Sequence, residues 1–187
     1  LLQQAIDTDK LHFPFVWKAA KMGYDGNGVK IIRKSEDLDF LTDQECMVED
    51  LVPFTHELAV TVVRNPSGEV KTYPVAEMEF HQEANQVEYV LCPARIDDSI
   101  KEKATQIALQ VSNALNHVGL LAVELFLTEE DDIYVNEVAP RVHNSGHHTI
   151  ETSITDQFEQ HIRAVLDLPL GNTDLITAGV MVNLVGA

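Results

Sequence analysis

A glycine-rich segment with nearby lysines is the first group of residues that could carry chemistry. Gly23, Gly26 and Gly28 alternate with polar residues, and Lys18 and Lys21 precede them. Glycine lets backbone N–H groups approach an anion closely, and lysine adds a point charge for a phosphate. Because the segment matches neither the Walker A pattern nor a G-x-G-x-x-G turn before a long helix, both of those sites are disfavoured. The segment is either a phosphate-covering loop or an ordinary glycine hairpin.

Two acids in neighbouring apolar segments form the second group. Alternation along residues 120–127 places Glu124 on the face opposite Leu121, Val123 and Leu125. A hairpin at the acidic turn 128–132 would bring Glu137 of the next strand near Glu124. Two such anions are costly unless they bind a divalent cation such as magnesium, which prefers carboxylate and phosphate oxygens. Alternatively, Glu124 pairs with a core arginine or faces solvent at a sheet edge.

A polar run follows the second acid directly. Pro140 ends the strand, and the loop after it is rich in donors that could surround an anionic substrate. Its histidines lack the H-E-x-x-H spacing and have no nearby cysteine, so zinc is disfavoured. The polar residues of interest are Arg141, His143, Asn144, Ser145, His147 and His148.

Glu49, Glu57 and His81 are weaker candidates for a nucleotide site. The strand that ends near residue 52 could offer its backbone groups to the edge of a base, and a nearby acid could accept from ribose hydroxyls. Met47 and Phe54 are expected in the core.

The composition restricts the class of protein. The chain has 187 residues, 45% of them hydrophobic, and a formal net charge of -17, which disfavours a nucleic acid partner. No segment reaches the ~18 consecutive apolar residues of a membrane span. The only cysteines, Cys46 and Cys92, are far apart, which favours a reducing cytoplasm over a disulfide framework. Because the first residues include neither an initiator methionine nor a signal peptide, we expect a soluble, cytoplasmic fragment of a longer chain.

The periodicity predicts a small front lobe and a larger back lobe, an α+β arrangement. In the front lobe we expect strands at 13–18, 29–33 and 45–49 and a short helix that has Ser35 as its N-cap and runs through Leu41. In the back lobe we expect a hairpin of 58–64 and 70–75, a strand at 87–92 and an amphipathic helix at 99–118 capped by Gly119. A second hairpin of 120–127 and 133–138 and a helix at 156–166 complete it.

The order of these motifs resembles the ATP-grasp superfamily, and within it the 5-(carboxyamino)imidazole ribonucleotide synthase family. The resemblance runs from about Phe13 to the end of the chain. Its most specific part is Ala-Pro-Arg-x-His-Asn-Ser-Gly-His, which separates this family from biotin carboxylases and D-alanine ligases. The segments that carry it are Lys18 with residues 23–28, Val48 and Glu49 with Glu57, and residues 136–147.

The resemblance implies ATP and Mg²⁺ as cofactors. Residues 23–29 and Lys18 look like the lid over the phosphates, and residues 49–52 look like the adenine hinge. Glu57 would hold the ribose, and His81 would line the nucleotide site. The ATP-binding residues implied in this way are Lys18, Gly23, Tyr24, Asp25, Gly26, Asn27, Gly28, Val29, Glu49, Asp50, Leu51, Val52, Glu57, His81, Asn136 and Glu137.

The resemblance also assigns the chemistry. Glu124 and Glu137 look like the magnesium ligands, and Arg141 like the catalytic residue that stabilises charge on the carboxyl intermediate. Residues implied in binding the aminoimidazole ribonucleotide or the transferred carboxyl group are Tyr24, Asp25, Arg141, His143, Asn144 and Ser145.

The implied reaction is the ATP-dependent carboxylation of 5-aminoimidazole ribonucleotide with bicarbonate in purine biosynthesis, by a ligase that is a homodimer at full length. The partners are thus ATP, bicarbonate and the ribonucleotide, with no nucleic acid and no membrane. The alternatives are a formate-using ligase of the same pathway and a nucleotide-binding module without turnover.

The chain departs from the family pattern at three positions. Met22 stands where glycine is usual, Asn27 where a basic residue is expected and Val142 where proline is expected. We expect a tail or linker at 1–12, the lid subdomain at 13–51 and the larger lobe with metal and substrate loop at 52–187. The family's N-terminal lobe and C-terminal domain are missing, so this fragment alone is expected to be inactive.

Overall fold

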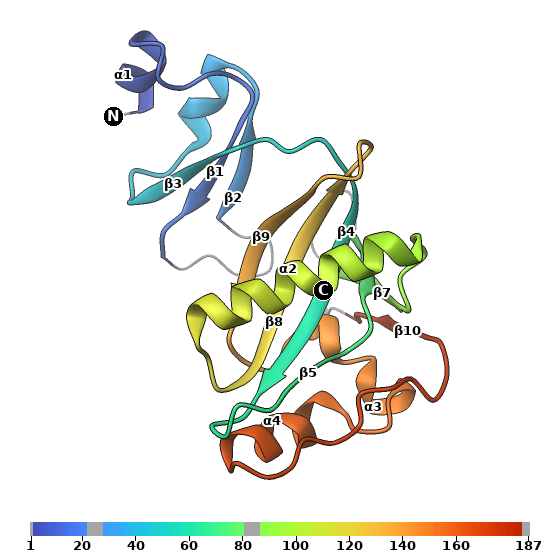
Figure 1. The fold of residues 1–187 in the computed structure, drawn as a ribbon. Coiled ribbons are helices and arrows are strands. Elements are labelled where there is room, and N and C mark those ends of the chain that lie inside the picture. Colours follow the sequence, from blue (N-terminus) through green and yellow to red (C-terminus); the bar gives the residue numbers. More distant parts are fainter. Residues whose placement is uncertain (1, 22–27, 81–86, 185–187) are drawn as a thin grey trace. The chain divides into compact units, whose positions relative to one another are not determined.

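The computed structural model describes residues 2–21, 28–80 and 87–184. These residues form two compact units, one ending at Pro53 and the other beginning at Phe54 (Figure 1). The predicted boundaries at 12/13 and 51/52 remain predictions.

The first unit is a three-stranded antiparallel sheet in the order β2-β1-β3. Its core is formed by Phe15, Trp17 and Ile32, and Leu2 and Ile6 pack against it. The segment expected to be a tail or linker thus includes a helix that contributes to this core. The elements are α1 (Leu2–Asp7), β1 (Phe15–Ala19), β2 (Val29–Ile32), η1 (Ser35–Phe40) and β3 (Cys46–Asp50).

The second unit is built on a seven-stranded antiparallel sheet in the order β10-β7-β6-β4-β8-β9, with β5 paired to β4. Its strands are β4 (Phe54–Arg64), β5 (Val70–Thr72), β6 (Ala76–Phe80), β7 (Val87–Cys92), β8 (Gly119–Thr128), β9 (Ile133–Ala139) and β10 (Gly179–Val182). Its helices are α2 (Asp98–Leu115), η2 (Asn144–Gly146), α3 (Thr149–Thr152) and α4 (Gln157–Val165).

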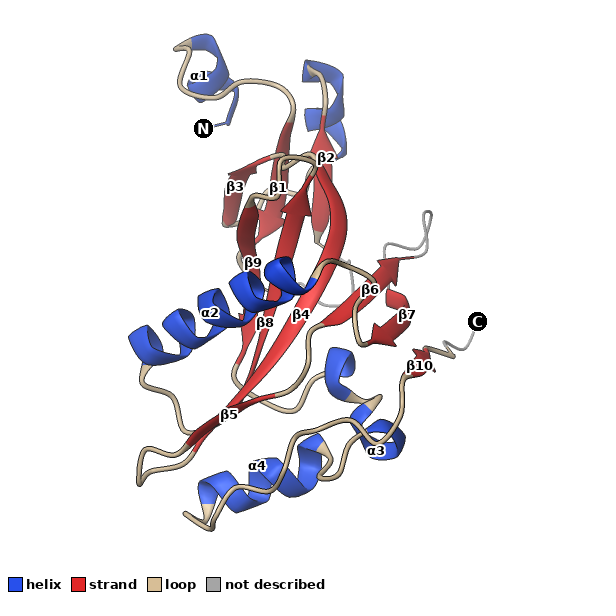
Figure 2. Cartoon of the chain, turned by 45° about the vertical axis from the view of Figure 1, so that its right-hand side comes forward, coloured by secondary structure: helices blue, strands red, loops and turns tan. Residues whose placement is uncertain are grey.

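Strand β8, between β4 and β9, is buried along nearly its whole length, and α2 crosses one face of the sheet (Figure 2). Leu121, Val123 and Leu125 join the cluster that packs under α2, as the alternation predicts. Leu120 points the other way and packs with Ala164 of α4. Side chains of even number in β8, Glu124 among them, therefore lie on the face away from α2.

Several predicted boundaries are corrected by the structure. α2 ends at Leu115 because Asn116 adopts the left-handed conformation of a C-cap, with φ 47°, so Gly119 begins β8 and is not the cap. The first residue outside η1 is Lys34, not Ser35. Met47 and Phe54, expected in the core, are 53% and 40% exposed.

No helix among the described residues is long and apolar enough to cross a membrane. Both cysteines are free thiols, with Cys92 buried and Cys46 half-buried.

Candidate functional site

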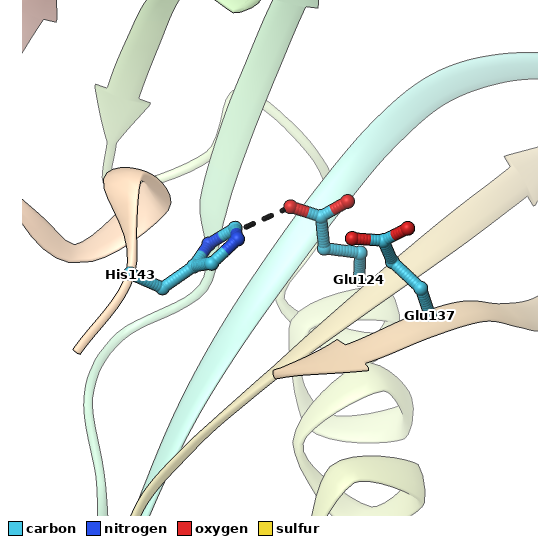
Figure 3. Close-up of side chains that lie close together, drawn as sticks. All are labelled: Glu124, Glu137 and His143. Carbon is cyan, nitrogen blue, oxygen red and sulfur yellow. Dashed lines mark ion pairs between the residues drawn. The ribbon is translucent and has the colours of Figure 1, made fainter. Parts of the chain in front are cut away.

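Glu124 and Glu137 are direct partners across β8 and β9. Glu124 is 7% exposed, whereas Glu137 lies on the outer strand and is exposed. Figure 3 shows both carboxylates on the same side of the strand pair. The prediction that the hairpin brings these acids together is confirmed, and their binding of a metal remains a prediction.

A β-bulge produces this pairing. Leu125 pairs with Val135, and the next pair is Glu124 with Glu137, so Asn136 is the extra residue in β9. In a regular strand Asn136 would face Glu124, and Glu137 would face Val123 on the side covered by α2. The bulge therefore moves Glu137 to the face of Glu124.

His143 completes the cluster. Its Nδ1 lies 3.6 Å from Oε1 of Glu124, and the ligand atoms of Glu124, Glu137 and His143 all lie within 4.8 Å of one another (Figure 3). Among residues 2–21, 28–80 and 87–184 this is the one group of three such side chains. His147 and His148, weighed with His143 as zinc ligands, are not in it.

The loop around His143 is ordered by its own hydrogen bonds. His143 is the N-cap of η2, and its Nδ1 lies 2.9 Å from Oγ of Ser145 and accepts from the Ser145 N–H at 3.4 Å. Asn144 is half-buried, and its carbonyl accepts from the backbone of His147. Three predicted substrate contacts thus lie in one short turn beside the acidic pair.

The donor set fits a magnesium ion. Magnesium commonly takes one or two protein carboxylates and completes its shell with water and substrate phosphates. The paired acids supply those carboxylates, and an ion there would remove the repulsion between two register partners. His143 is not needed as a ligand, because the two carboxylates already supply the usual protein share of a magnesium shell.

Arg141 is placed differently from the acids. It is exposed, and its Nη1 donates to the carbonyl of Val142 at 3.0 Å. It forms no ion pair with Glu124 or Glu137 in the described part of the chain. Val142, one of the departures from the family pattern, packs against the cluster of Val63 and Leu120.

Glu57 lies on the same face of the sheet as Glu124. It is the register partner of Phe126, two residues along β8 from Glu124. The ring of Phe126 stacks on Phe54 with the centroids 4.3 Å apart. Sequence reasoning missed this aromatic pair, although the alternation along β8 placed Phe126 on the acidic face.

In the first unit, Lys18 and Glu49 form an ion pair with Nζ and Oε2 2.7 Å apart. They lie on the adjacent strands β1 and β3, and Lys18 is the less exposed, at 17%. Gly28 has φ 86°, and its carbonyl accepts from the N–H of Ala19 at 2.8 Å. Val29 begins β2, Asp50 ends β3, and half-buried Leu51 and Val52 follow.

The other predicted residues lie outside the described ranges. They are Met22, Gly23, Tyr24, Asp25, Gly26, Asn27 and His81.

His148, in the loop that follows His143, is a buried histidine. Burial lowers the pKa of His148 to about 4, and the nearby His147 contributes to the same shift. His148 Nδ1 lies 3.0 Å from Thr152 Oγ1, whose hydroxyl donates to the His148 carbonyl, so Nδ1 carries a proton. His148 is therefore a neutral structural group.

The chain is similar to known proteins along nearly its whole length. Residues 2–158 match the model of the ATP-grasp domain. The chain is 46% identical to the N5-carboxyaminoimidazole ribonucleotide synthase of Bacillus subtilis over 99% of this chain and 49% of that protein. The chain spans about half the length or less of the curated relatives it matches.

Solved structures of synthases of the same name superpose on the chain. An ADP complex of an N5-carboxyaminoimidazole ribonucleotide synthetase superposes with a TM-score of 0.90 and 44% identity, covering 97% of this chain and 48% of that chain. The Aspergillus clavatus synthase, in complex with ADP and 5-aminoimidazole ribonucleotide, superposes with a TM-score of 0.88 and 33% identity, covering 100% of this chain and 50% of that chain.

Proposed function

The chain belongs to the ATP-grasp family, and we propose that it forms the ATP-binding part of an enzyme that carboxylates 5-aminoimidazole ribonucleotide. The α+β ATP-grasp fold expected from the sequence is confirmed. The proposed activity belongs to the complete protein, of which this chain resembles one part.

In the proposed reaction a bicarbonate oxygen attacks the γ-phosphorus of ATP. The bond from that phosphorus to the β,γ-bridging oxygen breaks, and carboxyphosphate and ADP form. The substrate amine then attacks the carboxyl carbon, phosphate leaves, and the amine loses a proton. The products are 5-(carboxyamino)imidazole ribonucleotide, ADP and phosphate.

The observation that carries the proposal is the paired acids beside His143, in a chain similar along nearly its whole length to synthases of this name. Phosphoryl transfer of this kind requires positioning and neutralisation of charge more than a protein nucleophile. The described site provides two acids, an imidazole and the exposed cationic side chain of Arg141, which suit that requirement.

Glu124 and Glu137 are proposed to hold magnesium, with Asn136 beside them. A bound magnesium ion would neutralise charge on the phosphate oxygens of ATP. Glu124 is held in place by the buried centre of β8, whereas the exposed Glu137 depends on the bulge for its position. The two ligands are thus fixed by the sheet and not by loops.

The remaining roles are proposed from the family pattern. Lys18, with the glycine loop from Gly23 to Val29, would contact phosphates, and the segment from Glu49 to Val52 the adenine. Glu57 would bind the ribose, and its place on the acidic face of the sheet supports that role. Arg141 would reach the carboxyl intermediate, which requires its side chain to leave the Val142 carbonyl.

The test is phosphate release from ATP by the complete protein, with bicarbonate and aminoimidazole ribonucleotide each omitted in turn. We expect release only when both are present together with magnesium. Release that requires formate would identify the formate-using ligase instead. Absence of release under every condition would contradict the proposal. It would favour the alternative of a nucleotide-binding module without turnover.

The predicted homodimer and cytoplasmic location stay predictions. Sedimentation of the complete protein tests the first.

A further inference from the structure

Gln157, the first residue of α4, holds the backbone of His143 at two points. Its Oε1 accepts from the His143 N–H at 3.0 Å, and its Nε2 donates to the His143 carbonyl at 2.9 Å. The side chain is fully buried, with 0% exposure. Because a backbone N–H can only donate and a carbonyl can only accept, these two bonds fix the orientation of the amide.

The same amide also contacts His147. Gln157 Nε2 lies 2.7 Å from His147 Nδ1. Since an amide nitrogen only donates, His147 Nδ1 must accept, and the ring proton of the neutral imidazole is on Nε2. Burial lowers the pKa of His147, which agrees with a neutral ring.

Gln157 is itself held rigidly. Its backbone N–H donates to Thr149 Oγ1 at 3.0 Å, and Thr149 in turn donates to the Gly146 carbonyl at 2.6 Å. Asp156 caps α4 by accepting from the N–H groups of Phe158 and Glu159. A Cβ at residue 146 would lie 2.5 Å from Gln157 Oε1, so only glycine lets the loop approach the amide this closely.

The structure assigns to Gln157 the role of a positioning residue that fixes His143 beside Glu124. His143 lies in a turn, and its ring must stay 3.6 Å from Glu124 to belong to the cluster. His143 in turn contacts Glu124, a proposed ligand, and groups that orient metal ligands commonly affect metal affinity or activity by about 10- to 100-fold. Only the predicted effect on kcat rests on the proposed function; the positioning of His143 by Gln157 does not.

The chain contains a matched control in Gln160. It is also fully buried on α4, and it holds Gly171 in the same two-point manner. Its Nε2 donates to the Gly171 carbonyl at 2.9 Å, and its Oε1 accepts from the Gly171 N–H at 2.8 Å. Gly171 belongs to no proposed site, so Gln160 shares the structural role of Gln157 without the contact to His143.

The experiment compares Gln157→Met with Gln160→Met in the complete protein. Methionine is similar in size and flexible, so each change removes the hydrogen bonds with little change in volume. We expect similar losses of thermal stability in the two variants. Only Gln157→Met should lower kcat, by about 10- to 100-fold, with the KM for ATP unchanged within about threefold.

Two further measurements do not depend on turnover. Crystal structures should show the His143 ring displaced from Glu124 in Gln157→Met and unmoved in Gln160→Met. Nitrogen NMR of histidine-labelled protein should show His147 protonated at Nε2 in the wild type.

Equal losses of kcat in the two methionine variants, or an unmoved His143 ring in Gln157→Met, would overturn the assignment. A wild-type His147 protonated at Nδ1 would do the same. If the wild type fails to carboxylate the ribonucleotide, the proposed function fails, and the ring position and the histidine proton still decide the role of Gln157.

Discussion

Glu124 and Glu137 face each other across two antiparallel strands because Asn136 adds one residue to β9. The strand pair therefore presents two carboxylates on one face, where a divalent ion can bind both.

Changing Glu137 to Gln should have opposite effects on stability and turnover. Without a divalent ion, removing one of two opposed anions should raise the free energy of unfolding by about 0.2–1 kcal/mol. With magnesium and substrates, turnover should fall by roughly 10- to 100-fold. Chemical denaturation in a chelator, together with phosphate-release kinetics, checks both. Glu130→Gln, in the exposed turn beyond the strand, is the control. Unaltered magnesium-dependent turnover in Glu137→Gln would contradict its assignment as a ligand.

Deleting Asn136 should preserve the acidic pair. A regular β9 without this residue still places Val135 opposite Leu125 and Glu137 opposite Glu124. Stabilisation by magnesium should therefore persist in the deletion variant, measured as the rise of the unfolding temperature on adding the ion. Asn136→Ala is the control, because it removes the side chain and keeps the extra residue of the bulge. Loss of the magnesium effect in the deletion variant alone would show that the bulge does more than set the register.

How far the sequence could predict this site depends on which interactions determine each element. The helix α2 and the hairpin of β8 and β9 were predicted because their apolar periodicity is long and regular. That the acids lie close together followed from the hairpin. The bulge at Asn136 could not be predicted in this way. A register shift depends on pairing with another strand and does not change the apolar periodicity of the sequence.

Other elements were missed for similar reasons. β6 and β10 are short strands that are defined by pairing with distant segments, β6 with β4 and β7, and β10 with β7. Nor could the sequence alone indicate that Gln157 reaches His143, since thirteen residues, including η2 and α3, lie between them. The motif identified His143 as functional, and the residue that holds it was recognisable only from the folded arrangement.

Stability should fall as pH decreases from about 6.5 to about 4 because of His148. Burial lowers the pKa of His148 in the folded state. As the pH falls, the unfolded chain therefore binds a proton at this residue before the folded chain does. The stability that is present above the unfolded pKa is lost on acidification. His148→Asn should remove part of this decline, on the order of 2–3 kcal/mol. Unfolding free energies measured at pH 7 and pH 4.5 check it. His12→Asn, at an exposed position, should leave the decline unchanged; an equal effect of the two changes would count against burial as the cause.

Replacing Gly119 by Ala should destabilise the second unit. Gly119 has φ 100°, and a Cβ there would lie 2.7 Å from the ring of His161, which accepts from the Leu120 N–H at 3.1 Å. Backbone strain and the displaced ring should together cost about 1–3 kcal/mol. Thermal unfolding measures this cost. Gly68→Ala is the control, because Gly68 also has a positive φ, 93°, but nothing lies within 4 Å of the added Cβ. Equal losses would mean that the contact with His161 contributes nothing.

Direct titration of the complete protein with Mn²⁺, followed by electron paramagnetic resonance in the presence of ATP, tests the magnesium site most directly. Mn²⁺ replaces magnesium at carboxylate and phosphate oxygens. The wild type should bind the ion at the acidic pair, and binding should weaken by about tenfold or more in both Glu124→Gln and Glu137→Gln. Wild-type affinity in both variants would contradict the account.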